Sequence, residues 1–153
     1  MRKFALFLCL CAFVFGNLSL AAQTSEASEK QGEGLPHFIL AGLQAYKDKG
    51  PEEAMRVWIK DSPIDGSRDA LTQSNNLHQV QDYYGAYQTH EVIAIRVLSP
   101  RTRVIYLVMD FDKGPLFCKF VVYRSEQGWT LTNFNFNTKE EMIVPSEIGF
   151  STK

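Results

Sequence analysis

The sequence has 153 residues, of which 45% are hydrophobic and 22% are charged, and its formal net charge at pH 7 is −1. This length suffices for one domain with one hydrophobic core. No cluster of Lys and Arg stands out, so the composition argues against nucleic acid and anionic membrane surfaces as partners.

The N-terminal segment has the features of a secretory signal. Arg2 and Lys3 precede an apolar run over residues 4–16, and Ser19-Leu20-Ala21 offers small residues where a signal peptidase cleaves. We predict a signal peptide at 1–21, hence export to the periplasm or the exterior and no stable membrane span after cleavage. An uncleaved anchor is the alternative.

Residues 22–34 are small, polar and Gly-containing, which predicts a disordered leader. The remaining residues, 35–153, are predicted to form a single domain. Cys9 and Cys11 lie within the signal, so Cys118 is left without a partner for an internal disulfide.

Three amphipathic helices are predicted before the C-terminal half. Apolar residues recur at three-to-four spacing up to Gly50, and a second stripe begins directly after it. Ser67 is suited to cap a third helix. The predicted helices span residues 36–49, 51–59 and 67–84.

Residues 87–137 predict four β-strands, at 90–98, 103–111, 116–124 and 129–136. The gaps are too short for parallel crossovers, so the strands form an antiparallel meander. The predicted fold class is therefore α+β, with three N-terminal helices packed on a curved four-stranded antiparallel meander sheet. Four-residue turns would pair Leu98 with Arg103, Phe111 with Leu116, and Arg124 with Trp129.

This register sorts the side chains onto two faces of the sheet. The face that we expect the helices to cover is nearly all apolar, with four polar residues near its margins: His90, Arg96, Asn133 and Asn135. The outer face is mixed, yet apolar enough to favour a partner. A β-bulge would exchange part of the two sets. No element is predicted in 138–153, whose apolar residues are candidates to dock against a sheet edge.

This order of elements, together with Gly114-Pro-Leu-Phe117 and Gly128-Trp-Thr-Leu-Thr-Asn-Phe-Asn-Phe136, resembles small exported members of the nuclear-transport-factor-2-like superfamily, the cystatin-like cone. The resemblance covers about residues 35–145. It implies a curved sheet wrapped around helices, a pocket between them, and in many members a dimer through the outer face. Some members are enzymes with Asp, His, Tyr or Arg in the pocket. The predicted inner face here has no Asp, which argues against those activities.

Candidate ligand-binding residues lie along the expected pocket: Trp58, Tyr84, His90, Arg96, Cys118, Asn133 and Asn135. The two aromatic residues could form a pocket wall, with core packing as the alternative. The two Asn residues share a face and could hold a polar ligand, with a solvated edge strand as the alternative.

His90 could act as an acid or base, or could be a solvated rim group. Cys118 has no His placed beside it, so a small buried hydrophobe is favoured over a nucleophile. The outer face offers a candidate interface for a homodimer: Tyr106, Val108, Val121, Tyr123 and Phe134.

These features predict an exported, non-enzymatic binding or accessory domain for a small apolar or amphipathic ligand or for a protein partner. The alternative is a small pocket enzyme (a hydrolase, isomerase or lyase) that uses His90 or a pocket tyrosine. No zinc or calcium ligand pattern is present, so no metal or cofactor is expected.

Overall fold

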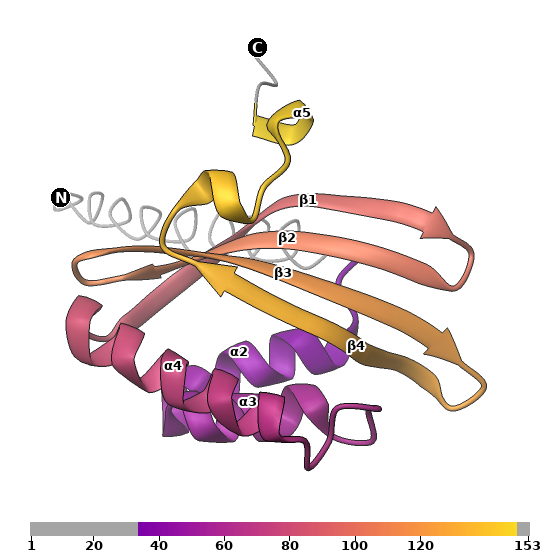
Figure 1. Ribbon diagram of the computed structural model, residues 1–153, viewed down its shortest axis with the longest axis horizontal. Coiled ribbons are helices and arrows are strands. Elements are labelled where there is room, and N and C mark those ends of the chain that lie inside the picture. The colour runs from indigo at the N-terminus through magenta and orange to yellow at the C-terminus, as the bar shows by residue number, and fades with distance from the viewer. Residues whose placement is uncertain (1–33, 150–153) are drawn as a thin grey trace, which may run out of the picture. The chain divides into compact units, whose positions relative to one another are not determined.

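The structure is a computed structural model that describes residues 34–149. Helices α2 (His37–Lys49), α3 (Pro51–Ile59) and α4 (Arg68–Tyr84) precede strands β1 (Tyr87–Ser99), β2 (Thr102–Phe111), β3 (Gly114–Ser125) and β4 (Gly128–Asn137). The strands form one antiparallel sheet in the order β1-β2-β3-β4, and the three helices lie on one face of this curved sheet (Figure 1). The predicted fold class is confirmed. The predicted signal at 1–21 and nearly all of the predicted leader lie outside the described residues.

Local sequence explains where the helices begin and end. Gly50 adopts φ 93°, a left-handed conformation that glycine tolerates, and this lets α2 stop and α3 begin at once with Pro51. The Ser67 hydroxyl accepts a hydrogen bond from the Ala70 amide at 3.1 Å and caps α4.

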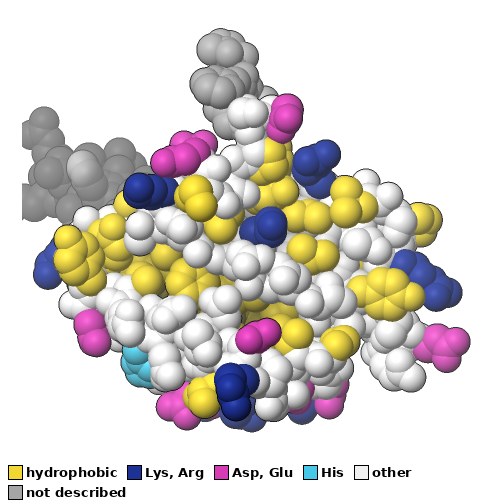
Figure 2. Space-filling model, in the orientation of Figure 1, with side chains coloured by type: hydrophobic (Ala, Val, Ile, Leu, Met, Phe, Trp, Pro, Cys, Tyr) yellow, Lys and Arg dark blue, Asp and Glu magenta, His cyan; other side chains and the backbone are white. Residues whose placement is uncertain are grey.

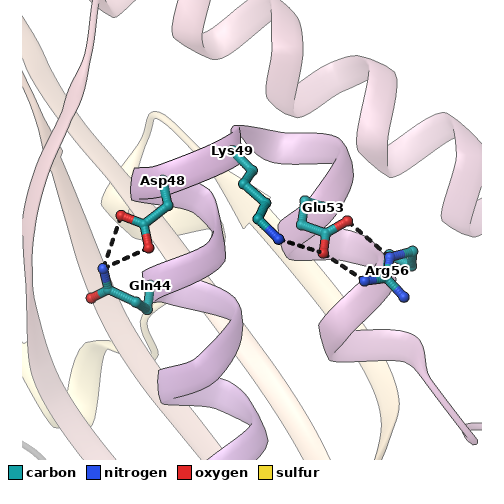
Figure 3. Close-up of polar contacts among 5 residues, drawn as sticks. All are labelled: Gln44, Asp48, Lys49, Glu53 and Arg56. Atoms are coloured by element: carbon teal, nitrogen blue, oxygen red, sulfur yellow. Dashed lines mark hydrogen bonds and ion pairs between the residues drawn. The ribbon is translucent and has the colours of Figure 1, made fainter.

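Polar contacts at the surface link α2 to α3 (Figure 3). Glu53 accepts hydrogen bonds from Arg56 at 2.5 and 2.8 Å, and its Oε1 lies 3.7 Å from the Lys49 ammonium. The bond from Arg56 lowers the pKa of Glu53 to about 2. These side chains are solvated, so the cluster orients the joint between the helices and adds little stability.

The core lies between the helices and the sheet, with Trp58 of α3 at its centre. Its indole N–H donates to the Ile39 carbonyl oxygen at 3.0 Å, and its ring centroid lies 5.2 Å from those of both Phe120 and Phe134. The side chain is only 1% exposed. Aromatic packing therefore holds α3 against the sheet, and the buried indole N–H of Trp58 has a hydrogen-bond partner.

All three hairpins close with two-residue turns, whereas four-residue turns are predicted. Phe111 pairs with Gly114, which slides β2 against β3 by two residues and leaves every predicted face unchanged. Arg124 pairs with Trp129, and this predicted pair is confirmed. At the first hairpin Val97 pairs with Arg103, a change of one residue that exchanges the faces near the turn.

Two register shifts, at Val97/Ser99 between β1 and β2 and at Val121/Val122 between β3 and β4, correct the predicted face assignments. The predictions that place Arg96, Asn133 and Asn135 on the helix-covered face are wrong. Arg96 pairs with Val104 on the outer face, and a register shift at Val121/Val122 turns both asparagines outward.

The same shift brings Phe134 into the core, where it is 4% exposed, so its predicted place on the outer face is also wrong. Phe136 packs against this core as well. The physical reason is that one extra residue in β4 lets two aromatic side chains leave water, at the cost of one irregular pairing.

The C-terminal segment packs on the opposite face of the sheet, where the 3₁₀ helix η1 (Glu140–Met142) and the short helix α5 (Ser146–Gly149) lie (Figure 1). Ile143 and Val144 are buried there against Val104 and Tyr106. The prediction of docking at a sheet edge is therefore wrong. The apolar outer face provides the reason, because covering it removes more hydrocarbon from water than an edge contact would.

Candidate functional site

A groove lies between α4 and the adjoining ends of β3 and β4, and we call it the α4–β4 groove. Its volume is about 560 Å³, within the range of small-molecule sites. It is lined by Asn76, Gln79, Val80, Tyr83, Tyr84, Leu116, Phe136, Asn137 and Thr138. In Figure 2 the surface between α4 and β4 is mainly hydrophobic (yellow) or white, with few charged side chains. The groove thus combines an apolar floor with uncharged polar groups.

Tyr84 is held in place by glycine. A Cβ atom built on Gly114 would lie 2.6 Å from the Tyr84 ring, so the ring rests directly on the β3 backbone. The Lys113 amide also donates to the Tyr84 carbonyl oxygen at 3.0 Å. The start of β3 therefore positions the last residue of α4.

Asp112 fixes the chain just after α4. Its carboxylate accepts hydrogen bonds from the Ala86 amide at 2.7 Å and from the Gln88 side-chain amide at 2.6 Å. Gly85 has φ 88°, and a Cβ atom there would lie 2.5 Å from the Asp112 carboxylate. The β2–β3 turn thus clamps the junction of α4 and β1, and with it one end of the groove.

The aromatic side of the groove is open to solvent. The rings of Tyr83 and Tyr84 meet edge to face with centroids 5.0 Å apart, and Tyr83 is 73% exposed. On the opposite side, the Asn137 side-chain oxygen accepts a hydrogen bond from the Lys139 amide at 2.9 Å. The Asn137 NH₂ group has no partner among the described residues and is available to a ligand.

A second, smaller cavity of about 260 Å³ lies between α2 and β1 and includes His90 in its lining. The Tyr87 hydroxyl lies 3.0 Å from His90 Nδ1. Burial lowers the pKa of His90 and raises that of Tyr87, where nearby Cys118 and Asp110 add to the increase. Both side chains are therefore held neutral near pH 7.

Two predicted ligand residues belong to the core. Trp58 is 1% exposed and Cys118 is fully buried, and neither lines the α4–β4 groove or the second cavity. The concave face, where a pocket is expected from the resemblance, is filled by their side chains. Among the predicted ligand residues, Tyr84 and His90 line cavities, one each.

Burial of Cys118 makes a measurable prediction. Burial raises the pKa of the thiol, so at alkaline pH the unfolded chain loses a proton that the folded chain retains. Stability is therefore expected to fall as pH rises above about 8.5, by up to about 1.4 kcal/mol per pH unit. Urea unfolding from pH 8 to 10 measures this slope. Cys118→Ala should flatten it even if the variant is less stable throughout, and an unchanged slope would contradict the assignment.

Apart from Phe134, which packs in the core, the remaining predicted residues lie on the outer face. Asn135 donates a side-chain hydrogen bond to Asn133, so each satisfies part of the other's polar groups. Of the predicted interface, Tyr106 is buried beneath the C-terminal segment and Val121 packs at its margin, while Tyr123 is 38% exposed. Val108 is half-buried. A homodimer through this face stays a prediction, and its free area is smaller than the strand pattern indicates.

Sequence reasoning missed most of the groove, although a signal was present. Four of the α4 residues that line it, Asn76, Gln79, Val80 and Tyr83, recur at spacing i, i+3, i+4 and i+7. Such spacing places them on one side of a helix. A regular β4 strand would place Phe136 on the outer face, and the bulge that turns it toward the groove is not visible in the strand pattern.

The fold and the groove define a small α+β domain with a ligand-sized groove between a helix and an antiparallel sheet. No protein-family model matches the sequence, and a search of curated proteins gives no match. Among solved structures, a domain of unknown function with a cystatin-like fold from Nostoc punctiforme is 14% identical, with a TM-score of 0.47 and 83% of each chain covered. The intermembrane space region of the chloroplast protein ARC6 is 12% identical, with a TM-score of 0.40, and covers 77% of this chain and 97% of that one.

Within residues 34–149, no three His, Cys, Asp or Glu side chains converge as metal ligands. Across the same residues, no helix is long and apolar enough to cross a membrane.

Proposed function

We propose that this chain is an exported, non-enzymatic binding domain of the nuclear-transport-factor-2-like type, which holds a small amphipathic ligand in the α4–β4 groove. The observation that carries the proposal is the groove itself, with its apolar floor at Val80 and Phe136 above the buried Leu116 and its uncharged polar groups on α4 and β4. An amphipathic molecule would place its apolar part on the floor and its polar part among the amides. Export rests on the signal-like sequence of residues 1–21.

The chemistry of the lining supports binding over catalysis. None of the lining residues is His, Cys, Asp, Glu, Lys or Arg. Proton transfer or nucleophilic attack requires such a group within hydrogen-bond reach of the substrate, or a tyrosine activated by one. The titratable pair that a pocket enzyme would need, Tyr87 and His90, lies at the second cavity instead.

A neutral amphiphile tests the proposal directly. Pentaethylene glycol monooctyl ether, kept below its critical micelle concentration, is expected to shift the backbone amide resonances of residues 76–84 and 136–138 in a saturable manner. Tyr84→Ala removes an aromatic wall and should weaken binding about tenfold, because an aromatic side chain buried by a ligand contributes about 1.5 kcal/mol or more.

Tyr123→Ala is the matched control, since it removes a tyrosine on the outer face, away from the groove. It should leave the affinity unchanged. Shifts that spread evenly over the molecule, or equal losses in both variants, would show that the amphiphile does not use the groove.

A further inference from the structure

The groove lining carries information on the class of ligand, because it lacks charge. The side chains that can hydrogen-bond there are amides and hydroxyls, from Asn76, Gln79, Asn137, Thr138 and the two tyrosines. Each amide offers both donors and an acceptor, and each hydroxyl offers both. A charged ligand would find no counter-ion in this lining, whereas a neutral molecule rich in hydroxyl groups would be matched group for group.

The solvent exposure of the groove also favours a neutral ligand rich in hydroxyl groups. Asn76, Gln79 and Tyr83 are all solvent-exposed, so a bound molecule would lie along α4 and keep one side in water. A purely apolar ligand gains affinity mainly from enclosure, which this shallow arrangement does not supply. A hydroxylated ligand does not depend on enclosure in this way, because the hydroxyl groups on its outward side stay hydrated when it is bound.

The tyrosine pair supplies the apolar part of such a site. Tyr83 is 73% exposed and stands edge to face with Tyr84, so one large aromatic surface is left in water by the free domain. The C–H groups on the flat side of a pyranose ring can cover an aromatic face, and the ring's hydroxyl groups point sideways toward neighbouring amides. From Asn76 to Tyr83 the helix advances about 10 Å, which leaves room for more than one ring.

We infer that the α4–β4 groove binds a neutral oligosaccharide, with Tyr83 as the stacking residue and Asn76, Gln79 and Asn137 as hydroxyl-recognition groups. This inference rests on the proposed function and specifies its ligand class. The sugar ring is the amphipathic molecule, with apolar faces and a polar edge. The Asn137 NH₂ group, which no described residue engages, is assigned to a sugar oxygen.

The test titrates the ¹⁵N-labelled full chain with cellotetraose, chitotetraose and maltotetraose in turn, followed by amide resonances. At least one should give saturable shifts confined to residues 76–84 and 136–138. Tyr83→Ala should weaken that binding roughly three- to tenfold, the value of one aromatic contact. Tyr123→Ala, an exposed tyrosine outside the groove, should not change it. Affinity should also be independent of salt, since no ion pair is involved.

The amphiphile experiment separates two kinds of failure. Groove shifts with pentaethylene glycol monooctyl ether and none with the three oligosaccharides would overturn the saccharide assignment and leave the groove a binding site. No groove shifts with any probe would overturn both. Saccharide shifts that persist fully in Tyr83→Ala would also overturn the assignment, because the stacking residue would then be dispensable.

Discussion

Gly42→Ala is expected to destabilise the domain by about 3 kcal/mol, even though alanine favours helix by about 1 kcal/mol relative to glycine. A Cβ atom at this position would lie 2.0 Å from the Trp58 indole nitrogen and 2.2 Å from its Cδ1. The indole cannot retreat, because Phe120 and Phe134 pack against it. Any displacement would also break the buried hydrogen bond from the indole to Ile39. Urea unfolding of the variant measures the loss.

A double-mutant cycle provides the control. In a Trp58→Leu background the indole is gone, so Gly42→Ala should be neutral or slightly stabilising. The coupling free energy between the two positions should then be about 3–4 kcal/mol. A loss below about 1 kcal/mol for Gly42→Ala alone would show that the indole does not rest on the α2 backbone.

Phe134→Ala is expected to cost about 3–5 kcal/mol, since it removes a buried aromatic side chain from the centre of the core. Phe134 contacts both Trp58 and Phe120, with ring centroids 5.2 and 4.6 Å apart. Its neighbour in sequence gives the matched comparison. Asn133 is exposed, so Asn133→Ala should change the unfolding free energy by no more than about 0.5 kcal/mol.

This pair of variants tests the bulge at Val121/Val122 itself. A strand without the bulge would place residue 133 inside and residue 134 outside, and the two costs would then be reversed. The Thr132 hydroxyl, which donates to the Val121 carbonyl oxygen at 3.0 Å, lies at the irregularity. Equal small losses for both variants would contradict the described register.

Much of the fold was predictable because it depends on local signals. Gly50 and Ser67 mark helix ends through backbone conformation and capping, which act within a few residues. The gaps between the predicted strands are too short for parallel crossovers. An antiparallel meander therefore followed from the sequence without knowledge of how the helices pack on the sheet. Even a wrong turn length between β2 and β3 was harmless, because a shift of two residues preserves the faces.

The candidate site was less predictable, because it depends on contacts between distant segments. Tyr84 lines the groove as a consequence of Gly114 and the Asp112 clamp, which lie about thirty residues further along the chain. Trp58 and Cys118 are residue types that often line ligand pockets. Here both are buried, and the side chains packed around them leave them no contact with solvent. Residue types alone therefore suggested candidate ligand-binding residues, but they did not determine which of these side chains are exposed to solvent.

By itself the sequence determined the α+β class, the order of three helices and four strands, and the two-sided apolar character of the sheet. Only the tertiary structure decided which side of the sheet Arg96, Asn133 and Phe134 occupy, and that the C-terminal segment covers the outer face. The physical reason is that hydrophobic periodicity and capping act over one or two turns of chain. A one-residue bulge, by contrast, is selected by the total apolar area that the whole domain removes from water.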